Sequence, residues 1–213
     1  MDNYISLPSA PLIASFITGV LGPMIVIYVR YLVRKKNIQL NAKQKEFNFI
    51  VKNQNIINDT LNSLQEKYSI DRLWVCQFHN GGNFWPGNQS MKKLSVVFES
   101  TAPNISADIM KMQNIPVSFF SGLIQKMMSE HNYIALNISD IKDNALRYYW
   151  ESRGVALVYL YPIYCYDNML VGLLGVEQTN KHTLSKVVCE EIFDEAKTLS
   201  GYIANVVVKD TYN

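Results

Sequence analysis

The segment that decides the fold is 155–177, which reads VALVYLYPIYCYDNMLVGLLGVE. Two apolar runs, 155–165 and 170–179, are joined by Tyr-Asp-Asn at 166–168, and an Asp-Asn pair between two such runs is typical of a β-hairpin. Each run is apolar at odd and even positions alike, so both faces of each strand have to be covered. We therefore predict two adjacent antiparallel strands in the middle of a sheet. Their glycines at 172 and 175 predict close approach of a packed helix or a ligand.

A second pair of strands is predicted upstream, at 73–79 and 94–100. Side chains alternate along a strand, so Gln77 and His79 share one face where the first strand ends. Glycines follow directly, and polar side chains beside such a loop are a usual place for a small-molecule site. The candidate ligand-binding residues are Gln77, His79, Asn80, Gly81, Gly82 and Trp85. The alternative is a hairpin loop without a ligand, in which Asn and Gly make turns and the tryptophan covers the core.

Helical periodicity appears at 40–68, 104–113, 118–130 and 183–207. The first of these helices has apolar residues at alternating three- and four-residue steps: Phe47, Ile50, Ile57, Leu61, Leu64 and Tyr68. This spacing favours a parallel coiled coil between two chains within a linker helix at 37–69, and it fits packing on the domain's own sheet or terminal helix equally well.

A short strand is predicted at 133–138, followed by a polar segment at 139–152. Asp140 and Asp143 in this segment are typical of a helix start rather than of a metal site.

The amino-terminal segment, 1–36, has the pattern of a membrane anchor. Residues 11–29 carry no charge, and a helix of that length is close to the thickness of the hydrocarbon core of a bilayer. Basic residues cluster at 30–36. The pattern predicts one transmembrane helix at about 11–32, with the amino terminus outside and the carboxyl-terminal domain in the cytoplasm. A buried core helix is the alternative.

Composition and spacing exclude several classes of protein. The 213 residues carry a formal net charge of +2, which argues against a general nucleic-acid binder. The three cysteines have neither CxxC nor Cys/His spacing, which indicates reduced thiols rather than a disulfide framework or a zinc site. No histidine stands at motif spacing from a Ser, a Cys or a carboxylate pair, and the glycine loop lacks the Lys and Ser/Thr of a phosphate-binding loop. The sequence therefore predicts no catalytic site and no metal site, and we do not expect an enzyme.

Three runs together resemble the signature of GAF domains: Ser152–Val155, Leu157–Tyr164 and Leu170–Glu177, with the elements Gly-Val, Pro-Ile and Leu-Val-Gly. The resemblance covers all of the chain except the anchor. It implies an α+β fold in which an antiparallel five-stranded sheet is flanked by helices and preceded by the transmembrane helix. Long helices would cover one face, and a pocket would lie on the other face under the middle helices. The GAF-like domain is then 70–209, with a tail at 210–213.

Departures from known GAF subgroups narrow the expected chemistry. The lysine-to-acid motif of cyclic-nucleotide-binding members is missing, and residues 137–154, where bilin-binding members carry a cysteine, have none. Cys76 and Cys165 fall inside predicted strands, unlike the loop cysteines of methionine-sulfoxide-reducing relatives. No cofactor is therefore expected. Segment 78–82 also resembles stretches in membrane-tethered GAF-like proteins, several of them from bacterial viruses.

The sequence thus predicts a membrane-anchored cytoplasmic GAF-like sensory or regulatory domain. It would bind a small ligand and act through a homodimer or through a protein partner. The alternative is a ligand-free structural or protein-interaction module of a membrane complex or a viral particle. A ligand-sequestering or ligand-modifying activity is a third possibility.

Overall fold

The computed structural model describes residues 15, 19, 21–81, 83–84, 91–165 and 168–207. The chain divides into two units, Met1–Ile50 and Val51–Asn213, and the second contains the sheet. The elements in chain order are α2 (Gly22–Tyr68), β1 (Arg72–Asn80), β2 (Asn83–Phe84), β3 (Lys93–Thr101), β4 (Ile115–Pro116), η2 (Val117–Phe120), α3 (Ser121–Glu130), β5 (Ile134–Asn137), η3 (Ile138–Asp140), α4 (Asn144–Glu151), β6 (Leu157–Tyr164), β7 (Leu170–Gln178) and α5 (Lys186–Val207).

The described strands form one sheet of seven, with the order β4-β3-β1-β7-β6-β5 and with β2 paired to β1 off this path. All pairs are antiparallel. The predicted hairpin is confirmed, because β6 and β7 pair from Leu157↔Gln178 to Tyr164↔Leu170 and lie between β1 and β5. The predicted number of five strands is wrong. The two additional strands, β2 and β4, have two residues each, which is too short to produce a periodic pattern.

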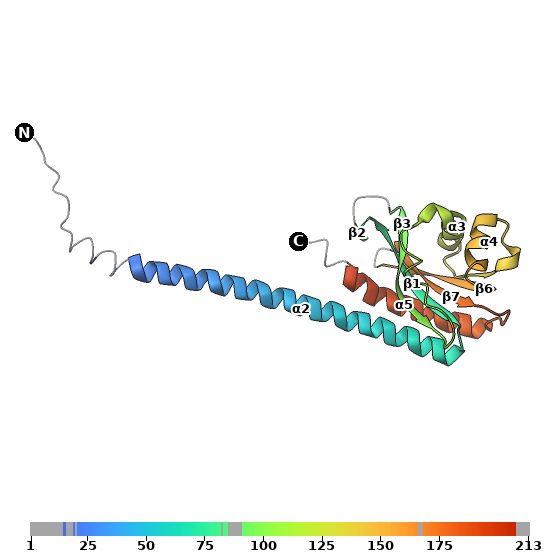
Figure 1. Cartoon of the computed structure of the whole chain (residues 1–213), viewed down its shortest axis with the longest axis horizontal. Helices are drawn as coiled ribbons and strands as arrows, with labels where there is room; N and C mark the ends of the chain where they lie inside the picture. Colours follow the sequence, from blue (N-terminus) through green and yellow to red (C-terminus); the bar gives the residue numbers. More distant parts are fainter. Residues whose placement is uncertain are drawn as a thin grey trace, which may run out of the picture. The chain divides into compact units, whose positions relative to one another are not determined.

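Two hydrophobic cores lie on the two faces of the sheet. The first core joins α5 and the end of α2 to side chains such as Leu73 and Val75 of β1. The second core joins α3 and α4 to Trp74, Cys76 and Phe78 of the same strand. Figure 1 shows α5 on one side of the sheet and α3 and α4 on the other. The alternation predicted along β1 is therefore confirmed, and the central strands are covered on both faces.

The apolar stripe of the linker helix packs on its own domain. Ile57, Leu61 and Leu64 are buried in the first core, beside the sheet and α5. This is the second of the two arrangements that the spacing allows, and these three side chains are not available to a coiled coil. Phe47, earlier on the same helix, is 60% exposed. Dimerisation stays a prediction.

Residues 104–113 form turns instead of the predicted helix. The carboxylate of Glu99 accepts hydrogen bonds from the backbone N–H groups of Asp108 and Ile109, at 2.8–3.0 Å. A side chain on the neighbouring strand thus satisfies backbone donors that a helix would otherwise pair, and periodicity alone does not reveal this competition.

A helix that periodicity does not mark, α4, lies in the segment predicted to be polar. Asp143 starts it by accepting hydrogen bonds from the N–H groups of Ala145 and Leu146, so the prediction of a helix start here is confirmed.

The predicted membrane span, 11–32, falls partly outside the described residues, which exclude 1–14, 16–18 and 20. Within the described ranges, no helix is both long enough and apolar enough to cross a bilayer. The described start of α2 is nevertheless apolar and solvent-accessible: Met24, Ile25 and Ile27 are each more than 60% exposed.

Candidate functional site

The residues predicted to bind a ligand lie where β1 ends. Gln77 and His79 are buried, Asn80 is half-buried, and Gly81 has a positive φ of 64° that suits the predicted turn. Gly82 and Trp85 lie outside the described residues. The structure therefore places four of the six positions in one short segment.

His79 is held by a buried hydrogen bond, with its Nε2 atom 2.8 Å from Oγ of Ser95. Burial lowers the pKa of the imidazole, and the nearby Lys93 lowers it further, so the neutral form is favoured. Alternation puts Gln77 and His79 on the face of the first core, against α5 and the end of α2. The resemblance to GAF domains implies a pocket on the opposite face. The predicted residues and the implied pocket are thus on different sides of the sheet.

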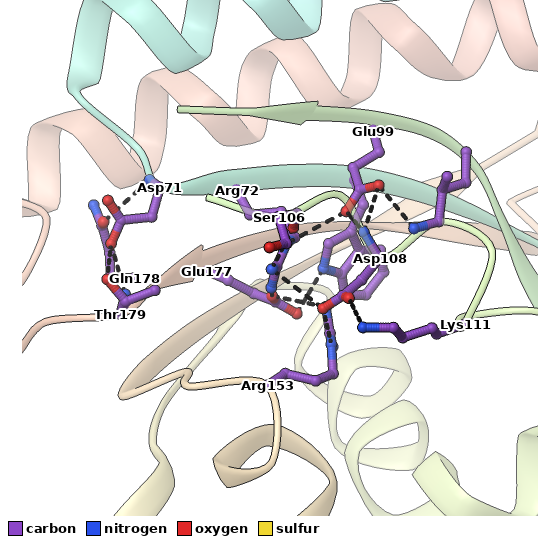
Figure 2. A network of polar contacts seen from close by, with 12 residues as sticks. Asp71, Arg72, Glu99, Ser106, Asp108, Lys111, Arg153, Glu177, Gln178 and Thr179 are labelled. Atoms are coloured by element: carbon purple, nitrogen blue, oxygen red, sulfur yellow. Dashed lines mark hydrogen bonds and ion pairs between the residues drawn. The ribbon is translucent and has the colours of Figure 1, made fainter. Parts of the chain in front are cut away.

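The face under α3 and α4 carries a buried ion-pair network that the sequence prediction missed (Figure 2). Arg72 of β1 lies at its centre. Its guanidinium group is 2.6 Å from a Glu177 oxygen, 3.2 Å from an Asp108 oxygen and 3.3 Å from a Glu99 oxygen. It also donates to the backbone carbonyl of Ser106 at 2.9 Å. Three strands and the 102–114 loop are joined by this one side chain.

Arg153, just after α4, is the second cation of the network. Its Nε atom donates to Asp108 at 3.1 Å, and one terminal nitrogen donates to Glu177 at 2.9 Å. The indole N–H of Trp74 donates to the other Glu177 oxygen at 2.8 Å. The Glu177 carboxylate, which is fully buried, is therefore compensated by two guanidinium groups and one neutral donor.

Asp108 connects this buried network to the solvent. Burial alone would raise the pKa of its carboxyl group, but hydrogen bonds from Lys111 and Arg153 and the charge of Arg72 hold that pKa below its usual value. Lys111 is largely exposed, and its Nζ atom lies 2.9 Å from Asp108. The carboxylate stays ionised at neutral pH and contacts one exposed cation and two buried ones.

A sequence signal for the network exists in the strands. Glu177 and Glu99 each stand near the end of a strand, on the side that the second core covers. A charge at a covered position requires a partner of opposite sign. The partners, however, come from segments up to 105 residues away, and spacing does not identify them.

Three buried polar atoms of residues 149–153 have no hydrogen-bond partner among the described residues. They are the hydroxyl of Tyr149, Nε1 of Trp150 and Nη1 of Arg153. The two aromatic rings belong to a cluster with Phe119 and Phe120, and the Arg153 guanidinium lies 5.2 Å from the centre of the Tyr149 ring. All three atoms are donors, so a molecule that supplies acceptor oxygens would satisfy them.

The same surroundings keep the Tyr149 hydroxyl and the Cys76 thiol protonated. Burial raises the pKa of Tyr149 to about 12, although the positive charge of Arg153 opposes the shift. Burial also raises the pKa of the Cys76 thiol to about 12. Both groups are therefore neutral at physiological pH, and the thiol is not a reactive thiolate. In the part of the chain that is described, no three His, Cys, Asp or Glu side chains are grouped so that they could hold a metal ion.

A concavity lies on the other side of the sheet. It is an open groove of about 610 Å³ between the end of α2 and α5, with Asp59, Glu191, Asp194 and Glu195 among its lining residues. Lys67 and Tyr68 both bond to Glu191 at this groove and tie the two helices together.

Comparisons with known proteins bear on the fold. No protein-family model and no curated protein matches the chain. Solved structures do match. The phycoerythrobilin-bound GAF domain of a cyanobacterial phytochrome has a TM-score of 0.58 at 16% identity, over 78% of this chain and 95% of that one. A GAF domain/HD domain protein from Geobacter sulfurreducens has a TM-score of 0.58 at 12% identity, over 75% and 96% of the two chains.

A far-red cyanobacteriochrome photoreceptor gives a TM-score of 0.58 at 15% identity, over 83% of this chain and 98% of that one. These similarities cover nearly the whole of each solved domain, and they agree with the antiparallel sheet between two groups of helices. The chain therefore has the α+β fold of GAF domains.

Proposed function

We propose that this chain is a sensory or regulatory module in which a GAF-like domain binds a small ligand and an apolar amino-terminal helix holds the domain at a membrane. The module acts through dimerisation or through a protein partner. The ligand site is the face under α3 and α4, where Tyr149, Trp150 and Arg153 present donors.

The observation that carries this proposal is the set of three buried donors without partners. A buried polar group without a hydrogen bond costs about 1–3 kcal/mol, so three in one place are unfavourable unless a bound molecule or water satisfies them. A ligand with acceptor oxygens and a flat apolar part fits both the donors and the aromatic cluster around Tyr149. One structurally similar domain holds phycoerythrobilin. Because residues 137–154 here lack a cysteine, we expect non-covalent binding.

Tyr149→Phe tests the site because it removes one unpartnered hydroxyl and leaves the ring in place. We expect the ligand-free variant to unfold at the same temperature as the native chain or a higher one, since no hydrogen bond is lost. A metabolite that raises the melting temperature of the native chain should bind the variant about 2- to 12-fold more weakly, which corresponds to about 0.5–1.5 kcal/mol. A thermal-shift screen of the full chain followed by calorimetry measures both quantities.

Tyr148→Phe is the matched control, because the neighbouring tyrosine is 70% exposed and should not affect binding. Equal affinity for the native chain and Tyr149→Phe would exclude the hydroxyl from the site. A screen in which no metabolite stabilises the native chain would favour the ligand-free interaction module, for which the open groove between α2 and α5 offers a surface.

The membrane anchor is proposed from the uncharged run 11–29 and from the exposed apolar start of α2. A helix that is apolar all round and remains uncovered is stable in hydrocarbon or against a partner, and not in water. The basic residues at 30–36 support an orientation with the GAF-like domain on the cytoplasmic side.

Topology is tested by cysteine labelling of intact cells with a membrane-impermeant maleimide. Asn3→Cys should be labelled in intact cells, whereas Lys186→Cys, at a side chain that is 84% exposed, should be labelled only after lysis. The native cysteines Cys76 and Cys189 are buried, and the half-buried Cys165 is replaced by serine in both variants to remove its background. The reverse labelling pattern would contradict the orientation, and labelling of neither site before lysis would contradict the span.

A further inference from the structure

We infer that Arg72 and Arg153 form an anion site that the chain's own Asp108 carboxylate occupies, and that a ligand carrying a carboxylate or phosphate group takes the place of Asp108. This inference rests on the proposed function, because it names the chemical class of the ligand. It adds a consequence, which is the release of the 102–114 loop when the ligand binds.

The first argument is the placement of the five charged groups. Arg72, Glu99 and Glu177 belong to the paired strands β1, β3 and β7. Asp108, in contrast, lies in the 102–114 loop, which has turns but no helix or strand. Because strand pairing holds the other two carboxylates, Asp108 is the carboxylate whose departure disturbs the structure least.

The second argument is the unused donor of Arg153. Its side chain is 8% exposed, and it uses Nε for Asp108 and Nη2 for Glu177. The remaining terminal nitrogen, Nη1, has no partner among the described residues. A ligand that replaces the Asp108 carboxylate and carries a second acceptor can also bond to Nη1, which gives it a bond that the Asp108 carboxylate does not make.

The third argument is charge. The buried network has two guanidinium cations and three carboxylates. Adding an anion to this set would bury a further uncompensated charge, which is strongly unfavourable. Exchanging a monoanion for the Asp108 carboxylate leaves the net charge of the network unchanged. Displacement is therefore favoured over simple addition.

The fourth argument is access. Lys111 contacts the Asp108 carboxylate and is 75% exposed on its side chain. It places a mobile cation at the solvent side of the site, where it attracts an anion and remains as a partner for the displaced carboxylate. Displacement also removes the loop from Glu99, whose bonds to the N–H groups of Asp108 and Ile109 depend on the loop position.

The test uses the full chain with inorganic phosphate and formate as probes, at about pH 6, where both are mainly monoanions, and at constant ionic strength set with chloride. In Asp108→Ala the site is vacant, so phosphate should bind about tenfold more tightly than to the native chain, where it has to displace the carboxylate. Formate should restore most of the melting temperature that this variant loses. In the native chain, phosphate should speed amide hydrogen exchange at Asp108 and Ile109.

Asp140→Ala is the matched control, since it removes an exposed carboxylate of the same type and should leave phosphate binding unchanged. Asp108→Asn replaces the alanine variant if the latter does not fold, because the amide keeps the shape and loses the charge. Arg153→Met in the Asp108→Ala background should abolish the formate effect. Equal phosphate affinity of the native chain and both Asp108 variants would overturn the inference, as would unchanged exchange in the loop.

The outcomes separate this inference from the proposed function. A metabolite that stabilises the native chain and Asp108→Ala equally, without faster exchange in the loop, leaves the ligand-binding function standing and removes the displacement of Asp108. Tight phosphate binding by Asp108→Ala with no metabolite bound to the native chain supports the anion site and contradicts a ligand-sensing role.

Discussion

Glu177→Ala is expected to destabilise the domain by about 3–5 kcal/mol, the cost of removing one partner from a buried ion pair. The side chain is fully buried, and its two oxygens accept from Arg72 at 2.6 Å, Arg153 at 2.9 Å and the Trp74 indole at 2.8 Å. Alanine leaves two guanidinium groups and one N–H with fewer acceptors, and all three side chains are more than nine-tenths buried. The measurement is equilibrium denaturation of the full chain.

Two further variants make this prediction specific. Glu177→Gln keeps an acceptor of the same shape and removes the charge, so it should lose less stability than alanine. Glu190→Ala removes an exposed carboxylate on α5 and should change the free energy of unfolding by no more than about 0.5 kcal/mol. A loss below about 1 kcal/mol for Glu177→Ala would mean that water or a ligand already compensates the two arginines.

Gly172→Ala is expected to cost about 3 kcal/mol or more, at the upper end for an overpacked position. A Cβ atom at residue 172 would overlap the backbone carbonyl oxygen of Cys76 on the adjacent strand. This overlap can be relieved only if β1 and β7 move apart. Such a movement would disturb their pairing, which runs from Arg72↔Glu177 to Gln77↔Gly172. The loss of stability is measured by denaturation, and circular dichroism shows whether the sheet survives.

Gly122→Ala is the matched control for this substitution. Residue 122 lies in α3, and an added Cβ would meet no atom within 4 Å. We expect the domain to gain about 0.5 kcal/mol, because alanine reduces the freedom of the unfolded chain at a helical position. A Gly172→Ala variant as stable as Gly122→Ala would contradict the close packing of β1 against β7.

Gly175 has a related role in the network. An added Cβ there would overlap the Trp74 indole, which lies against this glycine and donates to Glu177. The two glycines of the segment 170–179 were predicted to mark a close approach of a helix or a ligand. The close approach is confirmed, but the neighbour is in both cases β1: its backbone at Gly172 and its tryptophan at Gly175.

Much of the fold could be predicted from local pattern. The hairpin at 155–179 was predictable because two long apolar runs and a short turn leave few other arrangements. The helix start at Asp143 and the burial of Ile57, Leu61 and Leu64 in one stripe also follow from spacing. The loop at 102–114 was not predictable from periodicity, because a carboxylate from another strand satisfies its backbone.

The candidate site, like the fold, could be predicted only in part from the local sequence. Local sequence led to Gln77 and His79, a polar pair at a strand end, and the structure puts this pair against the long helices. The opposite face holds Tyr149, Trp150 and Arg153 with their unpartnered donors. Strand alternation says which residues share a face, and it does not say which helices cover that face.

By itself, the sequence determined the five longer strands, their alternation and the requirement that both faces of the central hairpin be covered, because these properties depend on residues close together in the chain. The tertiary structure alone decided which charges meet. Arg72, Glu99, Asp108, Arg153 and Glu177 come together only after β1, β3 and β7 have paired and the end of α4 has packed on the sheet. Contacts between such distant segments depend on sheet order and register, which local spacing does not encode.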